Sequence, residues 1–201
     1  MANKIAKRAM DIVLGGLGFL LSLPLWAILA LAIKLDSPGP ILFRQKRTGL
    51  HGRIFTMWKF RSMVADAEAR YRRLAHLNEE STGLIIRIPD DPRVTALGKV
   101  LRKFSLDEIP QFLNVLKGDM SLIGPRPPSP EEYERYNGLQ KRRLEAKPGL
   151  TGLWQVSGRK DTDFEFMVQK DIEYIDRQSF AFDLRILLKT IPVVLMGKGA
   201  R

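Results

Sequence analysis

The longest apolar segment of the chain lies near its N-terminus and predicts a membrane-associated helix. From residue 12 to residue 33 the side chains are apolar except for Ser22, and none is charged. As one straight helix these 22 residues would extend about 33 Å, enough to cross a bilayer core of roughly 30 Å. Pro24 removes a backbone donor, so we expect a kink near the middle, with each half reaching only about 16 Å.

Basic residues flank this segment on both sides. Lys4, Lys7 and Arg8 precede it, and a second group follows between Lys34 and Arg47. A spanning helix usually carries its basic excess on one side. We therefore expect a re-entrant helix over residues 1–36 that returns to the cytoplasmic face. Pro24 would form its bend, and the Ser22 hydroxyl would bond to the freed backbone groups.

A secretory signal peptide is the alternative for the same segment, because residues 30–32 read Ala-Leu-Ala and mimic a cleavage site. The apolar run is longer than the usual apolar region of such a peptide, and a basic domain follows it. Both features favour the membrane element.

The pattern of the remaining residues, 37–201, predicts one helix-rich α+β domain. A turn at 36–40 opens it, and Ser62 is the expected cap of the second helix. Ser129-Pro130-Glu131-Glu132 is a strong helix start, with a cap, a proline and two acids. The predicted strands are 41–43, 54–58, 84–88 and 120–123, and the predicted helices are 63–77, 97–103, 111–116, 163–175 and 180–196, besides the one that begins at Ser129.

The last of these helices has two possible environments. Residues 180–196 are rich in large apolar side chains, yet they include Arg185 and Lys189. That mixture suits an amphipathic helix lying in the lipid headgroup plane, bent by Pro192. A helix of the domain core is the alternative.

Charge narrows the classes of partner. Lys and Arg number 33 against 22 Asp and Glu, which gives a formal net charge of +11. The segment 44–73 alone carries nine basic and two acidic residues. Such an excess indicates nucleic acid, anionic lipid headgroups or phosphorylated substrates. Cysteine is absent, which excludes disulfides and thiolate metal sites.

The candidate chemistry centres on Asp107 and Glu108. The run Ser105-Leu106-Asp107-Glu108 has the form of a capping box and predicts that both carboxylates lie in the first turn of a helix. Capping alone would explain this pattern. Arg102 just before it and Arg126, held between two prolines just after it, suggest more. Carboxylates, guanidinium groups and a helix N-terminus together suit an anionic substrate with a divalent metal.

The same stretch resembles a known family. FSLDEIPQFLNVLKGDMSLIGPRP is similar to the signature of the bacterial sugar transferases, the monotopic phosphoglycosyl transferases that load a phospho-sugar onto polyprenyl phosphate. The blocks FRQKRTG, KFRSM, DPRVT, KPGLTG and LWQVSGR also resemble family blocks, in family order. The resemblance therefore covers nearly the whole chain.

The resemblance implies an enzyme that transfers a sugar-1-phosphate from a UDP-sugar to undecaprenyl phosphate and releases UMP. It implies a covalent phosphosugar on Asp107, which would also hold Mg²⁺, while Glu108 would orient Asp107, assist proton transfer or only cap. A helix terminus would hold Asp107 more firmly ionised. The fork of Arg126 is the first candidate for binding the donor phosphates. Further substrate-binding candidates, each of which could instead form a surface ion pair, are Lys59, Arg102, Gln155 and Arg159.

Family likeness also implies a place and partners. The enzyme would lie on the cytoplasmic face of the bacterial inner membrane, in contact with lipid. LWQVSGR is more similar to the hexose-1-phosphate transferases of exopolysaccharide and O-antigen assembly than to the amino-sugar branch. Which sugar is carried, and whether the chain is a monomer or a homodimer, stay open.

Two other functions compete with this one. A basic nucleic-acid-binding domain with a membrane tether would explain the charge but not the carboxylate pair among arginines, so we expect no nucleic acid partner. A non-catalytic scaffold of a glycan assembly complex would not release UMP from any UDP-sugar.

Overall fold

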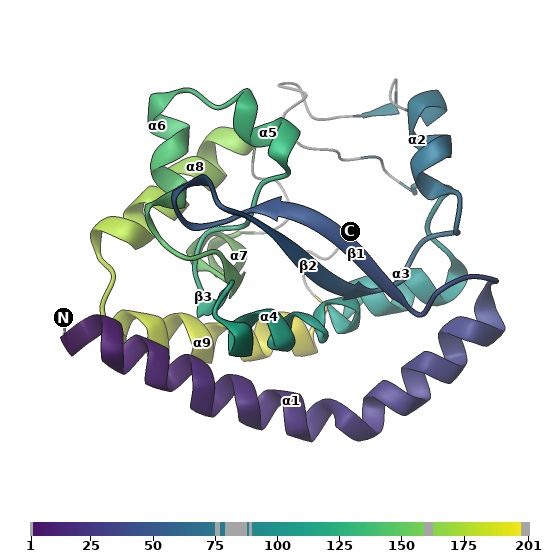
Figure 1. Ribbon diagram of the computed structural model, residues 1–201, viewed down its shortest axis with the longest axis horizontal. Helices are drawn as coiled ribbons and strands as arrows, with labels where there is room; N and C mark the ends of the chain where they lie inside the picture. Colours follow the sequence, from purple (N-terminus) through teal and green to yellow (C-terminus); the bar gives the residue numbers. More distant parts are fainter. Residues whose placement is uncertain (1, 75–76, 79–87, 89, 159–162, 198–201) are drawn as a thin grey trace.

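The computed structural model describes residues 2–74, 77–78, 88, 90–158 and 163–197. This part is helix-rich with two small sheets, which confirms the α+β prediction (Figure 1). The helices are α1 (Ala2–Asp36), α2 (Ala67–Leu74), α3 (Ala96–Lys103), α4 (Gln111–Lys117), α5 (Pro130–Glu134), α6 (Gly138–Lys141), α7 (Leu153–Ser157), α8 (Phe164–Asp176) and α9 (Phe180–Leu195). The strands are β1 (Leu42–Thr48), β2 (Ile54–Phe60), β3 (Ser121–Ile123) and β4 (Gly149–Thr151).

The apolar N-terminal segment forms one helix, α1, that continues through Pro24. Figure 1 shows α1 as a bent helix that runs along one side of the molecule. Because Pro24 has no N–H, the carbonyl of Leu20 loses its usual partner in the helix. The Ser22 hydroxyl donates to the carbonyl of Phe19 at 2.7 Å. The serine thus bonds to the backbone near the bend, but at the neighbouring carbonyl.

Polar contacts hold the N-terminal end of α1 on the domain. Lys7 Nζ lies 2.9 Å from a carboxylate oxygen of the buried Asp183 in α9. Arg8 donates to two carbonyls in the last turn of α4, each at 2.7 Å. Asp11 is buried and accepts from the amide of Leu122 in β3 at 2.9 Å. Lys7 and Arg8, two of the basic residues that precede the apolar segment, thus bind the protein itself.

Apolar packing holds the C-terminal half of α1. Leu29 and Ile33 are buried against Phe60 of β2 and Leu101 of α3. The Arg61 guanidinium donates to carbonyls in the turn after the helix, those of Ser37 and Pro38, each at 2.6 Å. On the face of α1 that points away from the domain, large apolar side chains are exposed, including Leu17, Leu20, Leu21, Leu23, Ile28 and Leu31.

The β1–β2 hairpin is antiparallel and lies across the domain. Arg47 pairs with Phe55 and Gln45 with Met57. Phe55 and Met57 are buried in the main core, so this face of the hairpin points inward. The sequence predicted both strands, but β1 extends five residues beyond the predicted end at residue 43.

Local signals predicted some helix starts and not others. Ser129 caps α5 in a complete capping box with Glu132, as predicted. Ser62 is not a cap, because α2 begins at Ala67 and the Ser62 hydroxyl instead accepts from Arg102 at 3.0 Å. The predicted strand at 84–88 lies largely outside the described residues.

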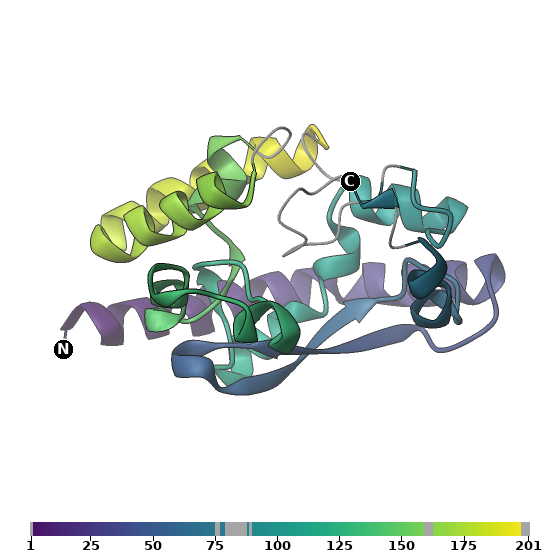
Figure 2. The same ribbon diagram turned by 90° about the horizontal axis from the view of Figure 1, so that it is seen from above.

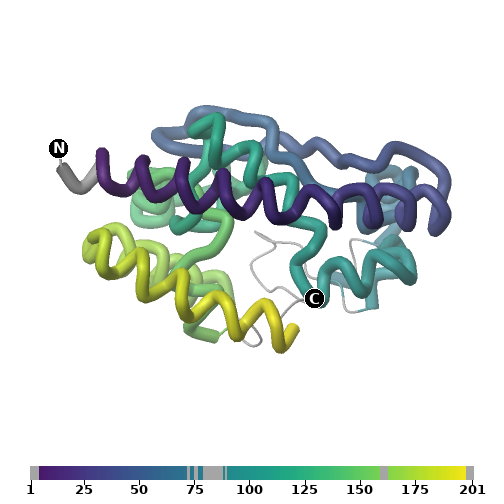
Figure 3. The backbone as a smooth tube through the Cα atoms, turned by 90° about the horizontal axis from the view of Figure 1, so that it is seen from below, coloured from purple at the N-terminus to yellow at the C-terminus, as the bar shows by residue number. Residues whose placement is uncertain are grey.

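Helix α9 carries a mostly exposed apolar stripe. Its buried side chains include Asp183 and Ile186, which face the domain. Figure 2 shows α8 and α9 along one side of the molecule and the hairpin along the other, and Figure 3 shows α9 beside α1. The exposed apolar residues of α9 include Phe180, Leu184, Leu188, Ile191 and Leu195. The helix therefore combines a core contact with an amphipathic surface.

Candidate active site

The carboxylate turn, which we define as Leu106–Glu108, is a short 3-10 helix between α3 and α4. Ser105 before it adopts a left-handed conformation, with φ 54° and ψ 26°, and its side chain makes no capping hydrogen bond. The predicted capping box is therefore wrong. Positive φ is uncommon outside glycine, and strained residues of this kind gather at functional sites. The turn presents its carboxylates by backbone geometry rather than by capping.

The two carboxylates have different surroundings. Asp107 is buried, with 7% of its surface exposed. Glu108 is more exposed and accepts from Lys59 Nζ at 2.9 Å. Lys59 comes from β2, 49 residues away in sequence, so the hairpin and the turn jointly build this side of the site. Of the two carboxylates, Glu108 forms the direct ion pair.

Burial dominates the electrostatics of Asp107. It raises the pKa of the Asp107 carboxyl, and the neighbouring charge of Glu108 raises it further. Lys59 and Arg102 oppose the shift but do not cancel it. The expectation that a helix terminus would hold this group more firmly ionised is therefore wrong. Asp107 is a carboxylate whose charge costs energy until a cation or a substrate group compensates it.

Arg102 completes the surroundings of Asp107. Its side chain extends from α3 and donates from Nε to the Ser62 hydroxyl at 3.0 Å. Burial lowers the pKa of its guanidinium, whereas the charge of Asp107 raises it. A guanidinium remains charged at neutral pH despite such a shift. The structure thus brings together four of the predicted site residues: Lys59, Arg102, Asp107 and Glu108.

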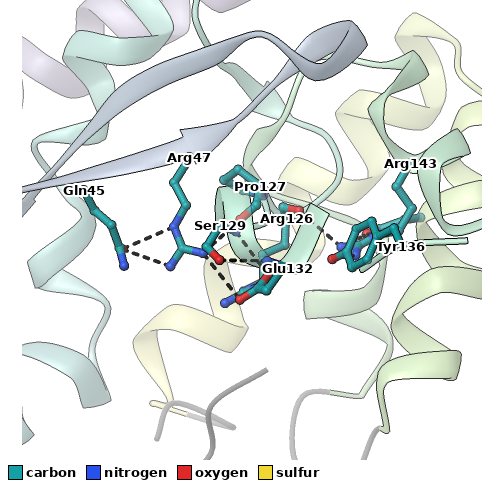
Figure 4. Close-up of polar contacts among 9 residues, drawn as sticks. Gln45, Arg47, Arg126, Pro127, Ser129, Glu132, Tyr136 and Arg143 are labelled. Atoms are coloured by element: carbon teal, nitrogen blue, oxygen red, sulfur yellow. Dashed lines mark hydrogen bonds and ion pairs between the residues drawn. The ribbon is translucent and has the colours of Figure 1, made fainter. Parts of the chain in front are cut away.

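Arg126 belongs to a second group of charges (Figure 4). Its Nη1 donates to Glu132 of α5 at 3.2 Å. Arg47 of β1 approaches the other oxygen of Glu132 at 3.7 Å. We call Arg47, Arg126 and Glu132 the arginine clamp. Burial and the adjacent charge of Arg126 lower the pKa of Arg47 to about 10, so it too is charged at neutral pH.

Buried residues fix the backbone of Arg126. Arg143 Nη2 donates to the Arg126 carbonyl at 3.2 Å. Arg143 itself is fully buried, and it donates to Asp171 at 2.8 Å and to the Tyr136 hydroxyl at 2.7 Å. Breaking such a buried pair costs about 3–5 kcal/mol. The loop that carries Arg126 is therefore fixed by the buried Arg143 and its partners.

The remaining predicted site residues are placed differently. Gln155 lies buried in α7, and its Oε1 has no hydrogen-bond partner among the described residues. Arg159 lies outside the described residues. In the KPGLTG block, the Gly149 amide is used internally, in a 2.9 Å bond to the Pro125 carbonyl. A Cβ at Gly149 would lie 2.1 Å from the Gly124 nitrogen, so this glycine serves close packing of two backbones.

Few protein side chains are available to bind a metal ion at this site. Within the described ranges, no group of three or more acidic or histidine side chains could hold a metal. Asp107 and Glu108 are adjacent carboxylates, and Mg²⁺ is commonly held by one or two carboxylates together with substrate phosphates. These residues therefore fit Mg²⁺ in that mode.

Sequence reasoning assigned no role to two residues of the clamp. Arg47 lies in the FRQKRTG block and Glu132 in the predicted start of α5. Local sequence signals mark both segments, but the proximity of Arg47 to Arg126, 79 residues apart, depends on tertiary structure.

Comparison with known proteins identifies the type of chain. The model of the family described as bacterial sugar transferase matches residues 2–197. The chain is 50% identical over 201 residues to galactosyl transferase CpsE from Streptococcus agalactiae. The aligned region covers 100% of this chain and 44% of CpsE. It is 38% identical over 199 residues to exopolysaccharide production protein ExoY from Sinorhizobium fredii, covering 98% and 88%.

A further relative is the UDP-glucose:undecaprenyl-phosphate glucose-1-phosphate transferase from Escherichia coli, 42% identical over 206 residues, covering 98% and 42%. The chain thus spans less than half the length of CpsE and of the Escherichia coli protein, but most of ExoY.

Proposed function

The chain belongs to the bacterial sugar transferase family, and on that premise we propose that it transfers a sugar-1-phosphate from a UDP-sugar to undecaprenyl phosphate. UMP is the second product. The named activities of the relatives, a galactosyl transferase and a glucose-1-phosphate transferase, support a hexose as the sugar. The reaction would start the assembly of an exopolysaccharide or O-antigen type of glycan.

The observation that carries the proposal is the buried carboxylate of Asp107 between two cations. Asp107 is desolvated, and the charges of Lys59 and Arg102 stabilise it without a direct ion pair among the described residues, which suits an oxygen nucleophile. Arg126 supplies a guanidinium fork for the charge of a phosphate group. Phosphoryl transfer depends mainly on positioning of the reacting groups and on neutralisation of the phosphate charge, and less on an activating base. Asp107 would provide the positioned nucleophile, and Arg126 would neutralise the phosphate.

The reaction would proceed in two balanced steps. In the first, an oxygen of Asp107 attacks the phosphorus that bears the sugar, and the bond from that phosphorus to the bridging oxygen breaks. UMP leaves with the electron pair, and an acyl phosphate joins Asp107 to the sugar. In the second, a phosphate oxygen of undecaprenyl phosphate attacks the same phosphorus. The Asp107 carboxylate leaves, and the undecaprenyl diphospho-sugar forms.

Mg²⁺ fits this scheme as a cofactor held by Asp107, with Glu108 adjacent to it. When bound, it would neutralise the diphosphate charge. Lys59 holds Glu108 at 2.9 Å and so keeps the second carboxylate beside the first.

The sharpest test separates the first half-reaction from the second. Wild-type protein is incubated with UDP-hexose labelled in the sugar and without polyprenyl phosphate. We expect UMP release of about one equivalent per chain, and label on the peptide that contains Asp107. Asp107→Asn removes the nucleophile with little change of size and should abolish both signals.

Asp176→Asn is the matched control, because Asp176 is a surface residue of α8 paired with Arg142 at 2.7 Å. It should behave as wild type. Turnover by the Asp107→Asn variant would exclude the covalent mechanism. UMP release that requires the lipid acceptor would indicate direct transfer in a ternary complex.

We further propose that both ends of α1 face the cytoplasm. The two ends pack on the same domain, through Lys7 and Asp183 at one end and through Ile33 and Leu101 at the other. A helix that crossed the bilayer would separate these contacts by the hydrocarbon core. Exposed apolar side chains between the docked ends, together with the stripe on α9, would enter the lipid.

Cysteine labelling tests this topology, because the chain has no cysteine of its own. Cysteines introduced at Ala2 and at Ser37 should be labelled from the same side of sealed vesicles. Pro24→Leu should straighten the apolar helix and shift a fraction of molecules to a spanning form. Labelling of the two positions from opposite sides in the native background would contradict the re-entrant model.

A further inference from the structure

The arginine clamp carries more positive charge than its carboxylate can neutralise. Arg47 and Arg126 are both cations, and the single carboxylate of Glu132 lies between them at 3.7 and 3.2 Å. The adjacent Arg143 is already neutralised by Asp171 at 2.7 Å. Among the three clamp residues one positive charge therefore remains, at a site where the Arg47 side chain is only 11% exposed. The exposed Glu131 acts on Arg47 only through its charge. Such a charge attracts an anion strongly because water screens it poorly.

The clamp is also rigid before any ligand binds. Gln45 accepts from Nε and Nη2 of Arg47 at 3.2 and 2.9 Å. The amide of Thr48 donates to the Pro128 carbonyl at 2.9 Å, which joins the end of β1 to the loop that follows Arg126. Glu132 accepts from the Ser129 amide in the capping box of α5. Groups fixed in this way lose little entropy when they bind a substrate.

The hairpin places the clamp and the carboxylate turn on one face. Lys59 pairs with Phe43, and Gln45 and Arg47 follow Phe43 at intervals of two residues in β1. Because side chains alternate along a strand, Lys59 and Arg47 project from the same face, about 13 Å apart along it at 3.3 Å per residue. Glu132, which also pairs with Arg126, approaches the Arg47 end of this face, and Glu108 pairs with Lys59 at the other end. Glu108 also acts electrostatically on Arg47.

We propose that Arg47 and Arg126 act as one anion-binding clamp, with Glu132 as its internal counter-ion, and that the clamp binds a phosphate group of the nucleotide donor. Arg47 is thereby assigned to the substrate-binding machinery, and Glu132 is a positioning residue that orients Arg126. The identity of the anion as a donor phosphate rests on the proposed function. The anion-binding property itself does not, since it follows from the charges and the burial.

The test measures binding of inorganic pyrophosphate by calorimetry to purified full-length protein in detergent. Arg47→Gln leaves the clamp neutral and should weaken pyrophosphate binding at least about tenfold. Arg47→Lys restores the charge without the fork and should recover binding to within about threefold of wild type. Arg44→Gln is the matched control: the same charge is removed from the same strand, but from the opposite, exposed face. It should bind as wild type.

Glu132→Gln provides a second test that does not depend on removing a buried arginine. Glutamine keeps the capping box of α5 but removes the competing carboxylate. Pyrophosphate binding should become about threefold tighter or more, whereas kcat for UMP release should fall because Arg126 is less well oriented. Glu134→Gln, an exposed acid of the same helix, is the control and should change neither quantity.

These outcomes separate the clamp from the proposed function. Equal pyrophosphate affinity of Arg47→Gln and Arg44→Gln overturns the clamp even if UMP is released normally. Unchanged or weaker binding by Glu132→Gln overturns the role of Glu132 as counter-ion. Conversely, wild-type protein that binds pyrophosphate through Arg47 but releases no UMP from any UDP-sugar supports the clamp and contradicts the transferase proposal.

Discussion

The carboxylate turn and the arginine clamp differ in how their charges are paired. In the turn, two carboxylates share the cations Lys59 and Arg102, and Lys59 pairs directly with Glu108 at 2.9 Å. In the clamp, two guanidinium groups share one carboxylate, which approaches both. The described residues provide Asp107 with no ion pair, whereas every charged member of the clamp has one.

In the mechanism that we propose, this difference separates a reacting group from a binding group. A nucleophile that was fully paired would have to lose its partner before it could attack, so an incompletely compensated Asp107 suits bond formation. A phosphate-binding group gains from rigidity, so the pairing of Arg126 with Glu132 suits recognition. The proposal therefore assigns different tasks to the same residue types, because the ratio of acidic to basic groups and their burial differ between the two regions.

The largest effect that would sharpen the comparison is expected at Arg126. Arg126→Lys keeps the charge but loses the planar fork that can bind two oxygens at once. We expect kcat/KM for UMP release to fall at least about tenfold, which is roughly 1.4 kcal/mol of transition-state binding. Near-normal kinetics would show that the clamp acts only through net charge.

A second variant perturbs the turn through its cation. Lys59 lowers the pKa of Asp107, so Lys59→Met should raise that pKa further and reduce the ionised fraction. The acid limb of the pH–rate profile of the first half-reaction should move to higher pH. Lys46→Met removes an exposed charge from β1 and should leave the limb in place. A limb that stays where it is in Lys59→Met would contradict a titrating Asp107.

Glu108→Gln should shift the pKa of Asp107 in the opposite direction to Lys59→Met, and by a smaller amount. Glu108 raises the pKa of Asp107, so its neutralisation should lower the pKa and move the acid limb to lower pH. The half-reaction should persist if Glu108 orients or assists rather than attacks. Movement in the same direction as Lys59→Met would show that Glu108 affects the profile through structure and not through charge.

The smallest expected effect is that of ionic strength, which should act on the arginine clamp more than on the carboxylate turn. Arg126 is 29% exposed, so added salt should weaken donor binding at the clamp and raise KM by a few-fold at most. The position of the acid limb should change little, because Asp107 is buried and poorly screened. Steady-state kinetics at two ionic strengths across the pH range measures both. A limb that moves as strongly as KM would place Asp107 in contact with solvent.

Local sequence patterns determined much of the architecture by themselves. The apolar run before Lys34 is helical, the Ser129 capping box begins α5, and the amphipathic segment after Asp163 forms α8. These features depend on interactions within one or two turns, where the identity of neighbouring residues is sufficient. The family blocks likewise single out Asp107, Glu108 and Arg126 as candidate site residues from the sequence alone.

Tertiary structure alone decided which charges meet. The sequence predicts a capping box at Ser105, but in the folded chain Ser105 is left-handed and its side chain makes no capping hydrogen bond. Arg47 meets Glu132, and Lys7 meets Asp183, over separations of 85 and 176 residues. With 33 basic and 22 acidic side chains, composition permits many pairings of similar energy. Burial selects among them, because a pair removed from water must be satisfied by whichever partner the folded backbone brings within reach.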